Sequence, residues 1–515
     1  MVDILFINPG NSDDLYQGLA AKLAAVEPPT WALLLAESVR SQGHSTNIID
    51  ANAEGISDEI LVQRVTELSP RIICLVVYGQ NVNAGTAGMS GASRIAKALK
   101  ASNTNLIISL IGSYVQALPI KALQDEQEID FGFTNEGVYA LWNLLKLPEI
   151  SMNGLKGIKG IVYRDKNEIL INKAEEVVPT ERMDLDLPGY AWDLLPYKEK
   201  PLDLYRAPFW HAEYDEEKRS PYAAIQSSLG CNFGCAFCMI NIVNRNDEDP
   251  IGVASNYSRM RFWSPNFMIK QFDILAEMGI KTIRITDEMF LLNRKYYIPL
   301  CEMLASRPYA SELRMWAYSR VDTITNPEFL QLVRSAGIKW LALGIESAER
   351  SVRLEISKGK FQDVDIKKVV KHLHDADIEV MSNFIVGLPG ENFELMQRTL
   401  DLSIDLCTSG WNMYAAMALP GSALYKDAIE KGYQMPDSYV GYSFHAYETI
   451  PMPTEYLTPA EILDFRDKAF ITYHSNPDFL ERIERKFGGK AVRNILDILG
   501  VTLKRRIIED AKLIS

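Results

Sequence analysis

Residues 228–238 read Ser-Leu-Gly-Cys-Asn-Phe-Gly-Cys-Ala-Phe-Cys and hold three of the six cysteines in this chain of 515 residues. Cys231, Cys235 and Cys238 are separated by three and then by two residues, whereas the other cysteines are scattered. Thiolates are soft ligands that suit zinc or the iron of iron–sulfur clusters. The spacing therefore predicts a metal or cluster site in a tight loop.

The number of ligands favours a cluster over zinc. Structural zinc sites usually close four ligands in paired two-residue spacings, and no fourth Cys or His lies near this loop. Three thiolates can hold three irons of a cubane and leave the fourth iron open to another ligand. A zinc loop with a distant fourth ligand and three unrelated core cysteines are the alternatives.

The cysteine loop follows the first of six predicted strands, at 223–228, 282–286, 314–319, 340–344, 380–386 and 412–417. Amphipathic stretches at 266–278, 327–336, 366–376 and 395–406 separate the strands. Repeated strand–helix units predict a partial barrel of six (βα) units, which we assign to residues 216–425. In barrels of this kind the chemistry lies at the C-terminal ends of the strands.

Another alternation of strands and helices precedes it. Strands are predicted at 3–7, 46–50, 72–78, 106–111 and 130–134, with helices at 31–42, 60–68, 91–100 and 121–124. This pattern predicts a doubly wound, Rossmann-like parallel sheet over residues 1–150, which would bind a ligand at the carboxyl ends of its strands. The whole chain is therefore expected to be an α/β protein.

Two further regions complete the predicted domain organisation. Residues 151–215 are rich in Pro and acidic residues and contain a hairpin that turns at 165–167, so we expect a strap that joins the two sheets. Residues 426–515 become helical and charged, with helices at 458–473 and 479–487. These helices are expected to cap the mouth of the barrel.

Composition excludes several classes of protein. The chain is 47% hydrophobic and 23% charged, which is typical of globular proteins and not of disordered or collagen-like ones. Its net charge of −13 gives no basic field for nucleic acid or anionic lipid. No apolar run approaches the roughly 18 residues of a membrane span, and the N-terminus reads directly as a strand. A cytoplasmic protein without membrane or nucleic-acid partners is the expectation, in a compartment that keeps thiols reduced.

The Cys-x3-Cys-x2-Cys spacing, with the aromatic Phe237 before the last cysteine, resembles the signature of the radical S-adenosylmethionine (SAM) enzymes. The resemblance implies a 4Fe–4S cluster whose open iron is chelated by the amino and carboxylate groups of SAM. One electron from an external donor of the flavodoxin or ferredoxin type then cleaves SAM to methionine and a 5′-deoxyadenosyl radical. This radical abstracts a hydrogen from the substrate.

The same resemblance implies a set of SAM contacts at the strand ends. Asp287 and Glu288, after the second strand, match an acidic motif that accepts the ammonium of the methionine moiety, and Arg320 is positioned to grip its carboxylate. The full predicted set is Phe237, Asp287, Glu288, Ser319, Arg320, Glu346 and Gly387.

The order of sheet, strap, barrel and helical tail resembles the cobalamin-binding class of these enzymes over nearly the whole chain. Matching features include Pro28-Pro-Thr, Gly43-His and Ile49-Asp-Ala-Asn, although Ile111-Gly-Ser-Tyr and Asn135-Glu-Gly depart from the glycine-pair and Gly-Glu-Gly forms. The implied cobalamin contacts are Asn8, Asp50, Tyr78, Gln80, Asn81, Gly112, Ser113, Glu136 and Gly137. A domain for another cofactor is the alternative.

The histidine that many cobalamin domains supply to cobalt is absent from the sequence. No Asp-x-His-x-x-Gly motif occurs, and His44 is the one histidine of the first domain. We therefore expect cobalamin to bind without a protein imidazole on cobalt, with the loop at 78–81 at its lower face.

The resemblance implies a function. The class most often moves a methyl group from SAM through methylcobalamin to an unactivated carbon, or to phosphorus, of a small-molecule or peptide substrate. Alternatives are a cobalamin-dependent cyclisation or ring contraction, a radical oxidoreductase or methylthiotransferase without corrinoid, and a non-enzymatic corrinoid carrier. The sequence identifies neither the substrate nor the catalytic side chains.

Overall fold

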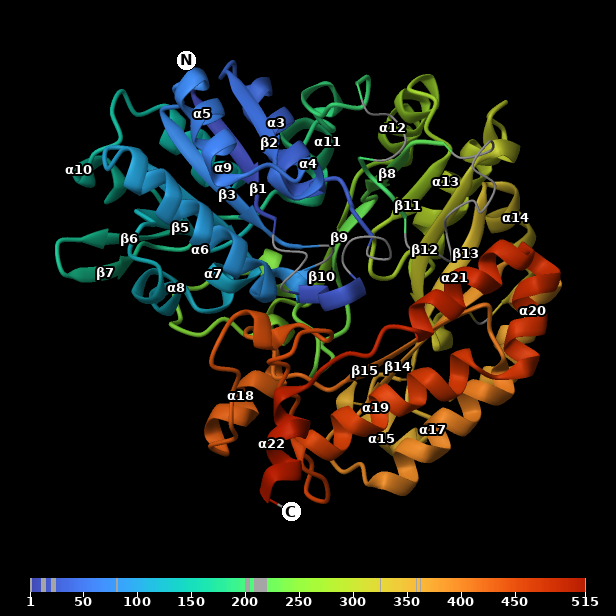
Figure 1. The fold of residues 1–515 in the computed structure, drawn as a ribbon. Helices are drawn as coiled ribbons and strands as arrows, with labels where there is room; N and C mark the ends of the chain where they lie inside the picture. Colours follow the sequence, from blue (N-terminus) through green and yellow to red (C-terminus); the bar gives the residue numbers. More distant parts are fainter. Residues whose placement is uncertain are drawn as a thin grey trace.

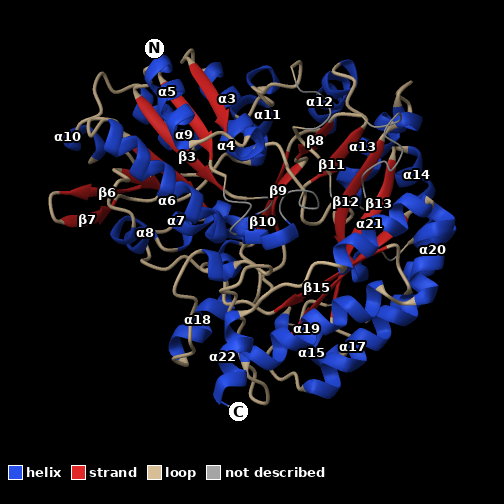
Figure 2. Ribbon diagram, viewed as in Figure 1, coloured by secondary structure: helices blue, strands red, loops and turns tan. Residues whose placement is uncertain are grey.

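The computed structural model of the chain describes residues 2–10, 15–19, 25–79, 82–199, 204–207, 220–324, 326–357, 359–361 and 363–514. Two large sheets stand side by side, and a small two-stranded sheet lies between them (Figures 1 and 2). The expected α/β architecture, a parallel-sheet domain followed by a partial barrel and a helical tail, is confirmed.

The first sheet has the strand order β2-β1-β3-β4-β5-β6-β7. Its parallel strands are β1 (Ile4–Asn8), β2 (Thr46–Asp50), β3 (Ile72–Val77), β4 (Ile108–Gly112) and β5 (Phe131–Phe133). Every residue of β3 is buried, as expected for a central strand covered on both faces. The predicted hairpin forms β6 (Ile161–Asp165) and β7 (Glu168–Ile171), which extend this sheet in the antiparallel direction.

Helices cover both faces of the first sheet (Figure 1). They are α3 (Thr30–Ser41), α4 (Ala51–Glu54), α5 (Asp58–Leu68), α6 (Gly85–Ser102), α7 (Ser113–Ala117), α8 (Pro119–Asp125), α9 (Val138–Leu145) and α10 (Met152–Leu155). Helices α3 and α9 contact each other, and α5 contacts α6. Because β3, β4 and β5 are parallel, the loops that follow them meet at one edge of the sheet, which we call the carboxyl edge.

The second sheet is a half-barrel of six parallel strands in the order β15-β14-β13-β12-β11-β8. They are β8 (Tyr222–Ile225), β11 (Thr282–Ile285), β12 (Arg314–Arg320), β13 (Ile338–Glu346), β14 (Glu379–Val386) and β15 (Gly410–Ala415). The helices between them are α12 (Pro265–Glu277), α13 (Arg294–Ala305), α14 (Leu330–Ser335), α15 (Arg350–Ile356), α16 (Ile366–Asp375) and α17 (Phe393–Leu406). Side chains of Ser264, Asp365 and Asn392 cap α12, α16 and α17, which explains where these helices begin.

The first strand of the half-barrel is shorter than predicted. The expected strand at 223–228 is two strands, because the chain leaves the half-barrel after β8 and forms β9 (Ser228–Cys231), which pairs antiparallel with β10 (Arg259–Phe262). Gly230 has φ +79°, and a Cβ there would lie 2.3 Å from the Arg259 carbonyl oxygen, so the close pairing needs glycine. We call residues 228–262 the cysteine-bearing unit.

The strap residues pack between the sheets. Elements α11 (Met183–Asp186) and the 3-10 turn Trp192–Leu194 lie here. The Ser38 hydroxyl of α3 donates to the Asp186 carbonyl oxygen at 2.6 Å, and the Trp263 indole donates to the Leu187 carbonyl oxygen at 2.8 Å. The strap therefore contacts the first sheet on one side and the half-barrel on the other.

The C-terminal helices are α18 (Ala423–Glu430), α19 (Pro459–His474), α20 (Pro477–Phe487), α21 (Gly489–Leu499) and α22 (Arg506–Ile514). Arg482 and Lys486 of α20 bind Glu379, the first residue of β14, and Phe487 stacks on Trp340 with ring centroids 5.5 Å apart. Helix α20 therefore covers the amino ends of the strands, and the expectation that these helices cap the mouth is wrong for α20. In the part of the chain described, no helix has the length and apolar character needed to cross a membrane.

Candidate functional site

The cysteine loop is held by one asparagine that the sequence reasoning missed. The Asn241 carboxamide accepts from the Cys231 backbone N–H at 2.7 Å and donates to the Phe233 carbonyl oxygen at 2.9 Å. Within the loop, the Phe233 N–H donates to Cys231 Sγ at 3.4 Å, and the Cys238 N–H donates to the Cys235 carbonyl oxygen at 3.1 Å. Asn241 fixes the loop from inside the cysteine-bearing unit; its signal in the sequence, a buried Asn in an apolar run, is too weak to find alone.

The three thiols influence one another. Burial raises the pKa of Cys231 to about 12 and that of Cys235 to about 11, and burial followed by nearby negative charge raises the pKa of Cys238 well above its ordinary value. Such thiols stay protonated until a metal displaces the protons. Over the described ranges no three His, Cys, Asp or Glu side chains could hold a single metal ion. A cubane makes a different demand, because each thiolate binds its own iron.

Asp287 and Glu288 are adjacent but have different surroundings. The Asp287 carboxylate accepts from the Ser227 N–H and from the Ser227 and Ser228 hydroxyls, each at 2.6 Å, so it holds the junction of β8 and β9. Glu288 has no hydrogen-bond partner among the residues that the structure describes, and its charge raises the pKa of Cys231 and Cys238. Burial raises the pKa of Glu288 to about 7. Of the two acids, Glu288 is the one available to a cation beside the cysteines.

Arg320, the last residue of β12, lies on the other side of the cysteines. Its Nε and Nη2 donate to Asp322 at 2.6 and 2.7 Å, and its guanidinium carbon lies 3.8 Å from the ring centroid of Phe233. Its Nη1 points to Cys235 Sγ at 3.9 Å. Asp322 and Phe233 hold the guanidinium in place and leave Nη1 toward the cysteine loop, where an anionic group of a ligand would meet it.

Glu346, the last residue of β13, lies near Arg320. Its φ of +68° is in the left-handed region, at a bulge in the pairing of β13 with β14. A Cβ at Gly344 would lie 2.6 Å from Glu346 Oε1, so Gly344 makes room for this carboxylate. Burial raises the pKa of Glu346 to about 7. An uncommon backbone conformation at a half-buried acid close to Arg320 is typical of a functional site.

The other predicted SAM contacts have simpler surroundings. Phe237 packs against a small apolar cluster that includes Leu388, next to the predicted contact Gly387. Gly387 has φ +75°, and a Cβ there would lie 2.6 Å from Ile462 Cγ2 of α19. The buried Ser319 hydroxyl is 2.7 Å from the Thr323 hydroxyl. All seven predicted SAM residues stay predictions as ligand contacts.

Asn8 and Asp50 meet at the carboxyl edge of the first sheet. The Asn8 amide donates to Asp50 Oδ1 at 2.8 Å, and the Tyr205 hydroxyl of the strap donates to Oδ2 at 2.9 Å. Asp50 also caps α4 by accepting from the Ala53 N–H at 3.1 Å, and burial raises its pKa to about 6. This carboxylate is already engaged in holding β1, β2 and the strap together.

Further along the same edge, glycines bring the ends of β3 and β4 close together. A Cβ at Gly112 would lie 2.2 Å from the Val77 carbonyl oxygen, and one at Gly85 would lie 2.1 Å from Ser113 Oγ. The hydroxyls of Ser113 and of Thr86, which follows Gly85, are fully buried, and neither has a hydrogen-bond partner in the described part of the chain. Buried hydroxyls without a partner are costly, so this pair fits the acceptor groups of a ligand. The predicted contacts Gln80 and Asn81 lie outside the described residues.

The predicted contact Glu136 binds the cysteine-bearing unit. Its Oε2 accepts from Arg261 Nη2 of β10 at 2.7 Å, and its Oε1 accepts from the Val178 N–H of the strap. Glu136 and Arg261 are 1% and 3% exposed, so the ion pair is buried. The neighbouring Gly137 has φ +83° and begins α9, with no space for a Cβ beside Ile111.

Two more residues of this edge bind the cysteine-bearing unit, one through its side chain and one through its backbone, and the sequence signalled neither. Asn83 Oδ1 accepts from the Met239 N–H at 3.0 Å, and the Gln116 carbonyl oxygen accepts from the Arg245 guanidinium. The segments that follow β3, β4 and β5 thus each contribute at least one bond. The cysteine loop is therefore docked against the edge where a parallel sheet binds its ligand, as its place between the two sheets in Figure 1 indicates.

His44 is far from this edge in the topology. It lies two residues before β2, at the amino end of the strand, and its Nδ1 is 3.9 Å from Asp3 Oδ2. Since β2 is parallel to its neighbour, the two ends of the strand lie at opposite edges of the sheet. His44 therefore cannot reach a ligand at the carboxyl edge.

The half-barrel interior holds a buried ion pair that spans both sheets. Glu27, just before α3, binds Arg284 of β11, and Arg284 Nη2 donates to the Tyr318 hydroxyl at 2.5 Å. Burial raises the pKa of Glu27, and the Arg284 guanidinium acts in the opposite direction. A segment of the first domain therefore reaches into the half-barrel, a contact that no sequence motif signals.

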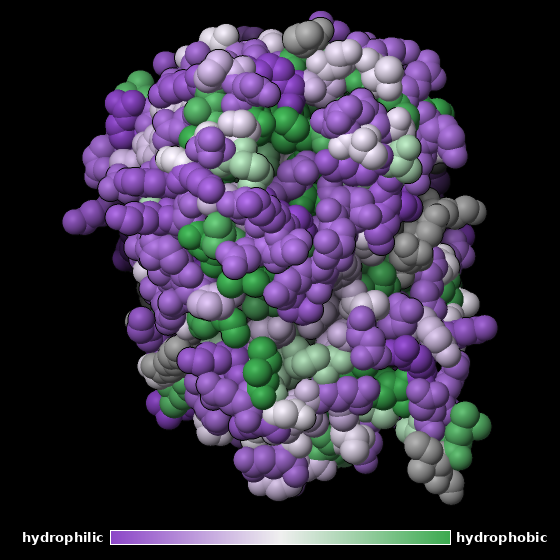
Figure 3. Space-filling view, turned by 90° about the vertical axis from the view of Figure 1, so that its left-hand side faces the viewer, coloured by the Kyte–Doolittle hydropathy of each residue, from purple (hydrophilic) through white to green (hydrophobic). Residues whose placement is uncertain are grey.

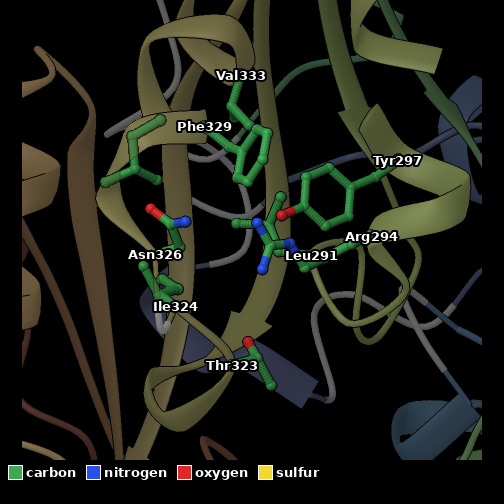
Figure 4. Close-up of a pocket in the computed structure, with 9 residues that line it drawn as sticks. Leu291, Arg294, Tyr297, Thr323, Ile324, Asn326, Phe329 and Val333 are labelled. Carbon is green, nitrogen blue, oxygen red and sulfur yellow. The ribbon is translucent and has the colours of Figure 1, made fainter. Parts of the chain in front are cut away.

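A crevice between α13 and α14 is separate from this site (Figure 4). It is lined by Leu291, Arg294, Tyr297, Thr323, Ile324, Asn326, Phe329, Leu330 and Val333. The lining contains none of the predicted site residues.

Comparison with known proteins matches part of the chain, including the cysteine loop, to a family model. Residues 225–403 match the model of the Radical SAM superfamily. A protein of Pyrococcus horikoshii, "Uncharacterized methyltransferase PH0819", is 25% identical over 485 residues, which are 93% of this chain and 92% of that protein. The anaerobic magnesium-protoporphyrin IX monomethyl ester cyclase of Cereibacter sphaeroides is 25% identical over 475 residues, which are 90% of this chain and 68% of that protein.

A solved structure shares the fold over nearly the whole chain. It is the radical S-adenosylmethionine methyltransferase TsrM of Kitasatospora setae, with cobalamin and a 4Fe–4S cluster bound. The TM-score is 0.63 at 15% identity, and the match covers 97% of this chain and 91% of that one. At this identity the likeness establishes the common fold, including the order of the two sheets.

Proposed function

This chain carries a radical SAM domain at residues 225–403, and from this premise we propose that it is a cobalamin-dependent radical SAM methyltransferase. It would move a methyl group from SAM to an unactivated carbon, or to phosphorus, of a small-molecule or peptide substrate. The observation that carries the proposal is the docking of the cysteine-bearing unit against the carboxyl edge of the first sheet. This arrangement puts a cluster loop and a ligand-binding edge on one shared space.

Cys231, Cys235 and Cys238 would hold a 4Fe–4S cluster, and the open iron would take SAM. Glu288 would accept a hydrogen bond from the amino N–H of SAM, and Arg320 Nη1 would bind its carboxylate, with Asp322 keeping the guanidinium oriented. When bound, the cluster supplies one electron to SAM, and the resulting radical abstracts a hydrogen from the substrate. A reactive species of this kind must meet its target before water does, which the buried position of these side chains supports.

Glu346, Ser319, Phe237 and Gly387 would complete the SAM site. The Glu346 carboxylate lies in the same electrostatic environment as Arg320 and Cys235, so it would meet a polar group of the methionine or ribose. The ring of Phe237 and the backbone at Gly387 would border the adenine, since both lie in apolar surroundings.

The first sheet would bind cobalamin at its carboxyl edge. The hydroxyls of Ser113 and Thr86 would donate to its nucleotide tail, and Gly112 would allow the close approach. Asn8, Asp50, Glu136 and Gly137 would act by shaping this edge, because their polar groups are engaged within the protein. Cobalt would lack a protein imidazole, and the loop at Tyr78 would cover its lower face.

The proposed chemistry also implies a setting. A radical SAM cluster needs an external reductant of the flavodoxin or ferredoxin type, and free thiols suit a reducing cytoplasm. The net charge of −13 supports a small molecule or peptide over nucleic acid as the substrate.

The test is anaerobic reconstitution with iron, sulfide and hydroxocobalamin, followed by counting each per chain and recording the visible spectrum. We expect about four irons and one corrinoid per chain. Iron without corrinoid would replace this proposal by a radical oxidoreductase. Corrinoid without iron, or full function of Cys235→Ala, would favour a corrinoid carrier.

A cobalamin-dependent cyclase is the second candidate, since one relative of equal identity is named a cyclase. The product mass separates the two. Methylation adds one carbon with its hydrogens and consumes extra SAM, whereas cyclisation adds no carbon.

A further inference from the structure

Asn83 docks the cysteine-bearing unit through its side chain and Gln116 through its backbone carbonyl oxygen, and both lie beside the position expected for cobalt. We propose that Asn83 and Gln116 are positioning residues that set the separation between the cluster on the cysteine loop and the corrinoid on the first sheet. This inference rests on the proposed function and adds to it the device that fixes the distance between the two cofactors.

Asn83 connects the two loops directly. It lies in the short 3-10 turn Val82–Ala84, which continues the loop that begins at Tyr78. Its Oδ1 accepts from the backbone N–H of Met239 at 3.0 Å, and Met239 immediately follows Cys238. Because the acceptor belongs to the first domain and the donor to the cysteine loop, a shift of one loop is passed to the other through a single bond.

Gln116 makes a second connection. Its side-chain Nε2 donates to the Tyr78 hydroxyl and to the Asn135 carbonyl oxygen, both at 2.5 Å. Its own carbonyl oxygen accepts from the guanidinium of Arg245, which is 1% exposed. The Tyr78 ring, which is expected at the lower face of cobalt, is therefore held by Gln116. Gln116 is held in turn by Arg245 of the cysteine-bearing unit.

The contact between residues 116–117 of the first domain and the cysteine-bearing unit, which we call the seam, has little room to adjust. A Cβ at Gly252 would lie 2.9 Å from the Gln116 carbonyl oxygen, and the Gly252 N–H donates to the Ala117 carbonyl oxygen at 2.7 Å. A Cβ at Gly421 would lie 3.0 Å from Ala117 Cβ and 3.3 Å from Met239 Cε. Close-packed interiors transmit displacement and do not absorb it, so the seam acts as a rigid spacer.

Two partial reactions of SAM depend differently on this spacing. Reductive cleavage breaks the C5′–S bond with one electron and gives methionine and a 5′-deoxyadenosyl radical, which without substrate takes a hydrogen atom from the buffer or the protein and leaves 5′-deoxyadenosine; this reaction needs the cluster alone. Methyl transfer breaks the methyl–S bond, passes the methyl to cob(I)alamin, whose electron pair forms the new bond, and leaves S-adenosylhomocysteine; this step needs SAM and cobalt in register. A displacement of about 1 Å can cost roughly 100-fold in rate, so a loosened seam would slow the second reaction and spare the first.

The experiment uses the reconstituted holoenzyme with SAM alone and titanium(III) citrate as the reductant. The variants are Asn83→Ala, Asn83→Asp, which keeps an acceptor, and the exposed Asn105→Ala as a matched control. Pulsed EPR measures the distance between the reduced cluster and cob(II)alamin, and chromatography measures S-adenosylhomocysteine and 5′-deoxyadenosine. Iron and corrinoid are counted in every sample.

For Asn83→Ala we expect full iron and corrinoid and a shifted or broadened distance. Methyl transfer should be slower by at least about tenfold and cleavage should change by less than about twofold. Asn83→Asp should recover most of the wild-type distance. An unchanged distance and product ratio, or an equal loss of both reactions together with iron, would overturn the inference. A wild-type protein that binds iron but no corrinoid would instead refute the proposed function, and the inference would fall with it.

Discussion

Replacing Glu288 by glutamine separates the cost of burying this carboxylate from its use in binding a cation. Burial raises the pKa of Glu288 to about 7, against an ordinary value of 4.5. Each pKa step of one is worth about 1.4 kcal/mol, so ionising this group in the folded chain costs at most about 3 kcal/mol above pH 7. Because the pKa of Glu288 is higher in the folded chain than in the unfolded chain, the stability that its protonated carboxyl contributes is fully present below pH 4.5. This stability is lost as the pH rises through about 7.

Glutamine does not ionise, so Glu288→Gln should be more stable than the wild type, and the gain should grow with pH. Thermal melting of the cluster-free chain at pH 5.5 and 8.5 measures this. A change of 1 kcal/mol moves Tm by roughly 2–4 °C in domains of 150–250 residues, so we expect the Tm difference to widen by a few degrees. Glu302→Gln, an exposed change of the same type on α13, is the control for the lost charge.

The same variant should bind SAM poorly. A hydrogen bond to a charged group contributes about 1.5–3 kcal/mol, so the Kd of the oxidised holoenzyme for SAM should rise roughly 10- to 100-fold. Equal Tm differences at both pH values would show that the carboxylate is not buried beside the cysteines. A more stable variant with wild-type SAM affinity would show that the ammonium binds elsewhere.

Four further outcomes follow from the same geometry. The Kd of the wild type for SAM should rise as the pH falls below about 7, since the ionised form of Glu288 binds the ammonium; calorimetric titrations at pH 6 and 8 measure it. Asn241→Ala should lower the iron content of the reconstituted chain, because the cysteine loop loses two bonds. Arg261→Met should destabilise the fold by about 3–5 kcal/mol by leaving Glu136 buried without its partner, and Arg261→Met with Glu136→Gln should recover most of that loss in denaturant melts. Gly112→Ala should abolish the corrinoid absorbance and leave iron unchanged, because its Cβ would lie 2.2 Å from a carbonyl oxygen.

Local sequence pattern was sufficient for most strands. The run at 72–78 is continuously apolar and β-branched, and β3 spans Ile72–Val77. The break between β8 and β9 was not predictable, because no Pro or Gly marks Gln226 and Ser227. The junction is fixed instead by Asp287, which lies 60 residues away in sequence from Ser227. A bond of that separation leaves no local signal.

The cysteine loop was likewise readable from spacing alone, whereas its supports were not. Asn241 and Asn83 hold the loop through the backbone, and a backbone N–H at any position can serve as their donor. Motif reasoning identifies side chains whose chemistry is unusual. It does not identify ordinary amides that act only through their position.

Glu136 has one role that the resemblance implies and another that the structure shows. The resemblance assigns this position to cobalamin, and the structure gives its carboxylate to Arg261 and Val178. Among the described residues of this edge, the side chains of Asn83 and Glu136 are committed to docking and that of Gln116 binds Tyr78 and Asn135, so few described polar side chains are left for a ligand. A corrinoid bound there must depend on backbone groups and on the buried hydroxyls of Ser113 and Thr86. Glycines, which let a ligand approach the backbone closely, therefore matter more at this edge than charged side chains do.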